Sequence, residues 1–174
     1  MSNPSEQATV TLVPFAAEHV PAMFALIDAD RAHLNAFEEG TADKYPTEQA
    51  LLDSVTAPRQ ESLVRERFVI VSALAQGPVG TINATPTDRQ QRNYNIGYWI
   101  GREHIGHGYA VLAVQSLATL LLERPATVSM TAQTHPDNVF SQRVLEGAGF
   151  LCTTRARKSH YFYRQLREPA PKSE

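Results

Sequence analysis

The chain has 174 residues, of which 43% are hydrophobic and 20% are charged, and this is the composition of a globular protein with one core. Its 16 Lys and Arg residues against 18 Asp and Glu residues give a net charge of -2. This balance provides no electrostatic footprint for wrapping nucleic acid, so we expect no nucleic-acid partner.

The cysteine content and the N-terminal sequence indicate the cellular compartment in which we expect the protein. Cys152 is the single cysteine, which excludes an intrachain disulfide and a thiolate-rich zinc site. Residues 1–9 are polar and lack the apolar core of a signal peptide, and the longest apolar stretches are too short to span a membrane. We expect a cytoplasmic protein with one domain over residues 1–168, no membrane partner, and a disordered tail over residues 169–174.

The N-terminal third predicts one strand and three short helices. Residues 8–15 alternate in polarity as a strand does. Residues 16–34 carry apolar side chains at helical spacing, with Asp28 and Asp30 as a break between two helices. Thr47 is placed to cap a third helix.

The middle of the chain predicts a meander of three strands. A β-branched run over residues 68–71 is followed by a turn signal at residues 77–78 and by a second strand over residues 79–84. The polar run 88–93 then predicts a turn before the alternating segment 94–100.

The C-terminal part predicts alternating helices and strands. Its elements are a helix over residues 111–123, a strand over 127–131, a helix over 138–147, and a last strand over 159–166.

The loop before the first of these helices has the composition of an anion site. A strand ends at Ile100 and Gly101, and then Gly106 and Gly108 lead into the helix. This arrangement presents backbone NH groups and the positive end of a helix, which suit a pyrophosphate. The alternative is that the glycines only turn the chain into the helix, and composition alone leaves both readings open.

Four segments resemble a known family. They are residues 96–101 (IGYWIG), 106–110 (GHGYA), 138–146 (NVFSQRVLE) and 149–150 (GF). Their order and spacing resemble the GNAT superfamily of N-acetyltransferases, and they are most similar to the Rim-type branch that acetylates the N-termini of ribosomal proteins. The resemblance covers residues 94–151, which would be the cofactor-binding half of the domain.

The resemblance implies an α/β fold of α+β type: a twisted, splayed mixed sheet of about six to seven strands flanked by helices. Acetyl-CoA would lie in the splay as co-substrate. The strand residues that would line its pantetheine arm are Tyr98, Trp99 and Ile100. The backbone NH groups that would hold its pyrophosphate are those of Ile105, Gly106, His107, Gly108, Tyr109 and Ala110.

The resemblance also assigns roles on the second helix. Asn138 would bond the pantetheine arm, and Ser141 would contact the cofactor and donate a proton to the leaving thiolate. A serine in a first helical turn is otherwise a capping or surface residue. Arg143 would contact the cofactor or lie solvated.

Departures from the family pattern concern proton transfer. Leu145 stands where many relatives have a tyrosine as general acid, and Asn95 stands where relatives often carry a glutamate. Glu38 is our candidate general base. The alternatives are Glu39, His33 and Asp43 in the segment that would flank the acceptor, although charged residues in a loop are usually only solvated surface.

The expected reaction is acetyl transfer from acetyl-CoA to a primary amine, on a protein N-terminus or a small molecule, by direct attack in a ternary complex. No metal is expected, because His104 and His107 lack further ligands at metal-binding spacing. An acidic cluster of Glu38, Glu39 and Asp43 would favour polycations.

Two alternative functions and the oligomeric state stay open. One is a catalytically silent acyl-CoA-binding or regulatory module. Another is a nucleotide-binding protein, but this sequence lacks the Lys and Ser/Thr of a P-loop. The oligomeric state is also open, since an apolar edge strand near Phe162 would suit a homodimer.

Overall fold

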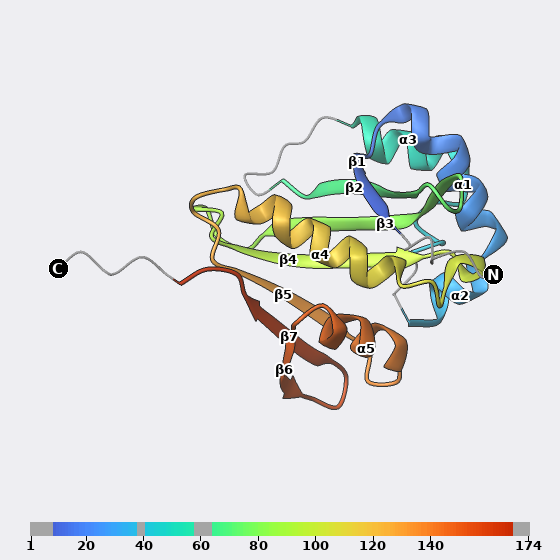
Figure 1. Cartoon of the computed structure of the whole chain (residues 1–174). Helices are drawn as coiled ribbons and strands as arrows, with labels where there is room; N and C mark the ends of the chain where they lie inside the picture. The colour runs from blue at the N-terminus through green and yellow to red at the C-terminus, as the bar shows by residue number, and fades with distance from the viewer. Residues whose placement is uncertain (1–8, 38–40, 58–63, 169–174) are drawn as a thin grey trace, which may run out of the picture.

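The computed structural model describes residues 9–37, 41–57 and 64–168 (Figure 1). Within these residues seven strands form one sheet in the order β1-β2-β3-β4-β5-β7-β6. The strands are β1 (Val10–Pro14), β2 (Glu66–Ser72), β3 (Gly77–Pro86), β4 (Asn93–Ile100), β5 (Ser129–Thr134), β6 (Leu151–Arg155) and β7 (His160–Gln165). The helices are α1 (Val20–Ala29), α2 (Arg31–Phe37), α3 (Glu48–Thr56), α4 (Tyr109–Leu122) and α5 (Val139–Gly147), with short 3-10 turns η1 (Ala17–His19) and η2 (Arg102–His104). The predicted tail over residues 169–174 lies outside the described residues.

The sheet is mixed and opens in its middle. Strands β1 to β4 pair antiparallel in chain order, and β5, β7 and β6 form a second antiparallel group. The two groups join through parallel pairing of β4 with β5, which runs only from Asn93–Ser129 to Asn95–Thr131. Beyond this point β4 continues to Ile100 and β5 to Thr134 without pairing to each other. The predicted splayed mixed sheet flanked by helices is therefore confirmed.

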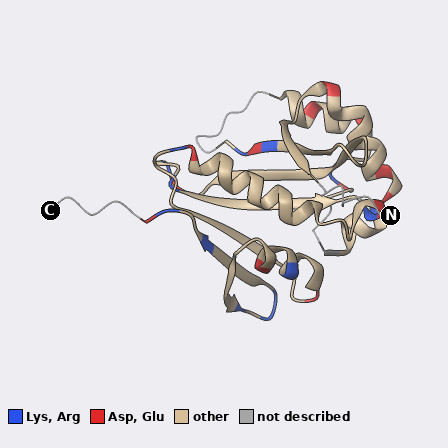
Figure 2. Ribbon diagram, viewed as in Figure 1, with Lys and Arg blue, Asp and Glu red and all other residues tan. Residues whose placement is uncertain are grey.

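Helices cover both faces of the sheet (Figure 1). On one face lies α4, whose 14 residues include no charged side chain and whose ribbon is drawn without blue or red (Figure 2). Its buried Leu117 and Leu121 pack in a core with Ile70, Ile82 and Tyr94 of the sheet. On the other face α1 and α3 bury a second core. None of the helices that the structure describes is long and apolar enough to cross a membrane.

The helix boundaries expected from capping residues are confirmed. Asp30 is the C-cap of α1, and α2 begins at the next residue. Thr47 caps α3, because its Oγ1 accepts a hydrogen bond of 3.1 Å from the NH of Ala50. The Asp30 carboxylate also accepts a bond of 2.8 Å from the NH of Arg102, which ties the end of α1 to the loop after β4.

Two expectations about the sheet are wrong. Gly77 and Pro78 begin β3 and the turn is formed by residues 73–76, because a bulge between Ile70 and Val71 accommodates the missing NH of Pro78 in the ladder. Phe162 does not lie on an edge strand. The chain folds β6 back outside β7, so Phe162 sits in an interior strand and is 1% exposed.

The turn between β3 and β4 is organised by Asp88. Its carboxylate accepts hydrogen bonds from the NH of Arg92 at 3.1 Å, the NH of Asn93 at 2.9 Å and the Asn93 side chain at 3.0 Å. Burial acts to raise the pKa of Asp88, but these hydrogen bonds outweigh it and hold the pKa below its ordinary value. The ionised form is therefore the form that the turn stabilises.

We predict that Asp88→Asn lowers the free energy of unfolding by about 1 kcal/mol at pH 7, because an amide nitrogen replaces an oxygen that accepts two bonds. A folded-state pKa below the unfolded value gives stability that is present above about pH 4 and is lost as pH falls through the folded pKa. The difference between parent and variant in urea unfolding should therefore shrink in acid. Glu146→Gln, at an exposed carboxylate without a bond among the described residues, is the control. Equal losses in the two variants would contradict the assignment.

Candidate active site

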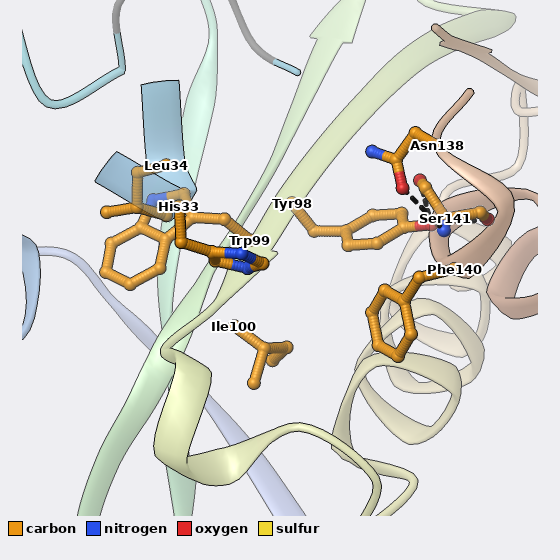
Figure 3. A pocket seen from close by; sticks show the side chains of 8 residues that line it. All are labelled: His33, Leu34, Tyr98, Trp99, Ile100, Asn138, Phe140 and Ser141. Carbon is orange, nitrogen blue, oxygen red and sulfur yellow. Dashed lines mark hydrogen bonds between the residues drawn. The ribbon is translucent and has the colours of Figure 1, made fainter. Parts of the chain in front are cut away.

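The opening of the sheet forms a groove between β4 and the start of α5 (Figure 3). Figure 3 shows His33 beside the Trp99 indole on one side, and Tyr98, Phe140 and Ser141 on the other. We call this the splay groove, and it is lined by His33, Leu34, Tyr98, Trp99, Ile100, Asn138, Phe140 and Ser141. It thus brings together residues of α2, β4 and α5 that are far apart in the sequence.

One pair of side chains crosses the opening. The Tyr98 hydroxyl lies 2.8 Å from the Ser141 Oγ and donates to the Ser141 carbonyl oxygen at 3.1 Å. Asn138 fixes the same turn of α5, because its Oδ1 accepts a bond of 3.0 Å from the NH of Ser141. Leu145, by contrast, is buried in the core. The phenol that the family pattern places on this helix is absent from it, and a phenol from β4 lies beside the serine instead.

A second groove continues from the first along the glycine loop. Ile100 and Phe140 line both. We call it the glycine-loop groove, and its other lining residues are His104, Ile105, Gly106, Gly108, Tyr109, Ala110, Val111, Arg143 and Val144. Together the two grooves run from the start of α4 to the Tyr98–Ser141 pair.

The glycine loop has the geometry of an anion site. Gly106 and Gly108 have φ of 89° and 77°, values that favour glycine, and no atom lies within 4 Å of where a Cβ would stand. The NH groups of residues 106–110 have no acceptor among the described residues. These donors stand at the N-terminus of α4, where the helix dipole also favours negative charge.

Most of the predicted cofactor residues line the two grooves, and two details differ. The NH of Ile105 already donates to the Arg102 carbonyl at 3.2 Å, so it is engaged within the loop. His107 is exposed and stacks on Tyr109 with ring centroids 5.5 Å apart, outside both linings. Arg143 is exposed and lines the glycine-loop groove.

The candidate bases are only partly described. Glu38 and Glu39 lie outside the described residues. Asp43 is exposed and accepts a hydrogen bond from Asn35 at 3.0 Å, and it does not line the grooves. Of the two candidates that the structure describes, His33 lines the splay groove. In the part of the chain that the structure describes, no three His, Cys, Asp or Glu side chains are grouped to hold a metal ion.

Phe140 is the main lining residue that sequence reasoning missed. It stands inside the NVFS motif, is 42% exposed, and lines both grooves. A large apolar side chain at an exposed position of an amphipathic helix was the available signal. The contributions of Val111 and Val144 depend on tertiary packing and had no such signal.

We predict that Tyr98 and Ser141 stabilise the fold as a coupled pair. In urea unfolding, Tyr98→Phe and Ser141→Ala should each lower the free energy of unfolding, and the double variant should lose less than the sum by about 1 kcal/mol. A coupling energy near zero would mean that the contact across the splay does not form in solution.

Comparison with known proteins identifies the family of the chain. Residues 9–151, more than half of the chain, match the family described as Acetyltransferase (GNAT) domain. Over 69 residues the chain is 35% identical to an uncharacterized N-acetyltransferase, YjdG, of Bacillus subtilis (strain 168). That segment is 39% of this chain, and it spans only 41% of the length of that relative.

Several solved structures share the fold. A ribosomal L7/L12 alpha-N-protein acetyltransferase, RimL, solved with coenzyme A, is 18% identical at a TM-score of 0.77, over 90% of this chain and 94% of that one. RimJ of Mycobacterium smegmatis, solved with a coenzyme A disulfide, is 22% identical at a TM-score of 0.77, over 94% and 85%. The aminoglycoside acetyltransferase AAC(6')-Ib, solved with coenzyme A and kanamycin, is 19% identical at a TM-score of 0.70, over 90% and 95%. The family that the motifs indicated is confirmed: this chain belongs to the GNAT acetyltransferases.

Proposed function

We propose that the chain transfers the acetyl group of acetyl-CoA to a primary amine by direct attack in a ternary complex. The observation that carries this proposal is the continuous groove from the NH-rich start of α4 to the hydroxyl pair of Tyr98 and Ser141. RimL and RimJ, which share this fold, were solved with coenzyme A and a coenzyme A disulfide. The groove and the membership of the GNAT family together support this proposal.

The two grooves suit the two ends of acetyl-CoA. A pyrophosphate carries negative charge and accepts hydrogen bonds, which matches the NH groups of residues 106–110, for which no described residue supplies an acceptor. The pantetheine arm is largely apolar with two amides. It would lie along β4 past Ile100 and Phe140, where the strand has no partner on its β5 side. Asn138 keeps its NH₂ group available for this arm while its oxygen caps α5.

Ser141 would supply the proton to the leaving thiolate. As the amine nitrogen bonds to the carbonyl carbon and the C–S bond breaks, the sulfur gains an electron pair and takes the proton of Ser141 Oγ. Tyr98 lies at hydrogen-bond distance from that oxygen, so it orients the hydroxyl and can replace the lost proton with its own. This arrangement offsets the absence of a tyrosine at Leu145.

His33 is the described residue that is best placed to receive the amine's proton. It lines the splay groove across from Ser141, and an imidazole nitrogen that carries no proton can accept one (Figure 3). Glu38, the base expected from the sequence, stays a prediction because it lies outside the described residues.

A silent acyl-CoA-binding module is the second candidate function, favoured by Leu145 in the core and Asn95 on β4.

We predict that Ser141→Ala slows acceptor-dependent release of coenzyme A by about a hundredfold, because general acid catalysis contributes at this scale. Thiol release from acetyl-CoA would be measured with peptide N-termini and with small amines such as kanamycin. Ser116→Ala on α4 is the matched helical serine and should leave the rate unchanged. Binding of acetyl-CoA without release by any acceptor would favour the silent module instead.

We predict that His33→Gln lowers kcat/KM most at neutral pH. At higher pH more of the amine is unprotonated in solution, so the deficit of the variant should shrink. The affinity for acetyl-CoA serves as the internal control and should stay the same. A deficit that is constant across the pH range would assign His33 a structural role rather than proton transfer.

A further inference from the structure

One face of the C-terminal half of the sheet is open. Helix α5 covers the other face, where Cys152 and Phe162 pack in the core with Leu145. Side chains alternate between the two faces along a strand, so the residues next to these two point away from α5. They are Leu151, which is 73% exposed, and Tyr161, which is 44% exposed. Two large apolar side chains therefore lie on the uncovered face of β6 and β7.

A row of cross-strand neighbours connects this face to the splay groove. Asn95 of β4 pairs with Thr131 of β5. Thr131 pairs with Tyr163 of β7, which in turn pairs with Leu151 of β6. Trp99, a wall of the splay groove, lies on the same face of β4 as Asn95, because an even number of residues separates the two. We call the outward side chains of β5, β7 and β6 the open face, and they are Thr131, Gln133, Leu151, Thr154, Tyr161 and Tyr163.

The turn that borders the open face is positively charged. Thr134 at the end of β5 pairs with His160 at the start of β7, so the turn between β6 and β7 lies at the end of the sheet where the splay opens. Arg155, Arg157 and Lys158 are exposed there, and none of them makes an ion pair or a side-chain hydrogen bond with another described residue. Residues 151–167 contain no Asp or Glu, and this turn carries blue segments in Figure 2. The positive charge at this edge of the open face is therefore not neutralised by its own hairpin.

The dimensions of the open face match an extended polypeptide. Neighbouring strands lie about 4.8 Å apart, so the three steps from β4 through β5 and β7 to β6 span about 14 Å. An extended chain advances about 3.3 Å per residue, so about four residues would cover this distance. An amine compound small enough to lie within the splay groove would not reach Leu151.

We propose that the open face binds the polypeptide that carries the acceptor amine, so that the substrate class is a protein N-terminus followed by apolar and acidic residues. This inference rests on the proposed acetyl transfer. The terminal amine would enter the splay groove beside His33, and the next residues would cross β5 and β7. Their apolar side chains would contact Tyr161 and Leu151, and their carboxylates would lie near Arg157 and Lys158.

The first test compares acceptors with the same amine and different lengths. They are a hexapeptide of Ser-Ala followed by two Leu and two Glu, the same hexapeptide with Gln in place of Glu, and the dipeptide amide Ser-Ala. Acetyl transfer would be measured at saturating acetyl-CoA, and binding to the protein loaded with coenzyme A would be measured by calorimetry. We expect the KM of the acidic hexapeptide to be about tenfold below that of the dipeptide amide, with similar kcat and with the Gln hexapeptide between them.

Variants of the apolar residues then assign this difference to the open face. Leu151→Ser combined with Tyr161→Ser should raise the KM of both hexapeptides about tenfold and leave the dipeptide amide unchanged, because both side chains are exposed and lie outside the splay groove. Leu74→Ser is the matched control, at an exposed leucine in the turn between β2 and β3, and it should change none of these values.

Variants of the cations test the preference for acidic residues. Arg157→Gln combined with Lys158→Gln should bring the KM values of the Glu and Gln hexapeptides together. Arg89→Gln removes an exposed cation in the turn between β3 and β4, at the end of β4 opposite to the splay, and it should keep the two values apart.

The outcomes separate this inference from the proposed function. Equal KM values for the hexapeptides and the dipeptide amide would overturn the inference and leave acetyl transfer standing. No release of coenzyme A with any peptide or with kanamycin would overturn the proposed function; hexapeptide binding that depends on Leu151 and Arg157 would then still support the docking surface, and no binding would overturn both. A dimer in sedimentation that Leu151→Ser dissociates, with unchanged KM values, would assign the open face to a second copy of the chain and overturn the inference.

Discussion

The site depends on where the parallel pairing of β4 and β5 ends. Parallel strands exchange hydrogen bonds along their shared length, but here the ladder stops after Asn95 and Thr131. Past that point the polar edge of β4 faces an opening instead of a neighbouring strand. An unpaired strand edge is a ready partner for an extended ligand with amide groups, and the pantetheine arm is such a ligand. Tyr98 and Ser141 are the contact that spans the opening, so the two hydroxyls proposed to act in proton transfer meet where the sheet opens.

Two sets of polar contacts fix the elements that carry the grooves, α4 and β4, to their neighbours. Arg124 after α4 makes two hydrogen bonds to Glu66 on β2, of 2.6 and 2.7 Å, and a third to the Tyr94 hydroxyl of β4 at 3.0 Å. The Glu66 carboxylate raises the pKa of Arg124, so this guanidinium stays charged. On the other side, Asp30 at the end of α1 binds the loop after β4 through Arg102. The C-terminal end of α4 is thus fixed to the starts of β2 and β4, and the loop after β4 is tied to the end of α1.

The local helices and strands and the family motifs could be predicted from the sequence, because caps and periodicity are encoded by neighbouring residues. Thr47 at the start of α3 and Asp30 between two helices follow directly from this. Contacts between segments that are far apart in the sequence were harder to predict. The absence of a tyrosine at Leu145 could be seen in the sequence, but the place of the Tyr98 phenol beside Ser141 depends on the geometry of the splay. The interior place of Phe162 depends on β6 folding outside β7.

The central claim is that the opening of the sheet holds acetyl-CoA with its sulfur at Ser141. A crystal structure of the protein with coenzyme A tests it most directly. We expect the pyrophosphate against the NH groups of residues 106–110, the pantetheine arm between β4 and α5, and the thiol in contact with the Ser141 and Tyr98 hydroxyls. A coenzyme bound elsewhere, or a splay groove still closed to it by the Tyr98–Ser141 contact, would contradict the account.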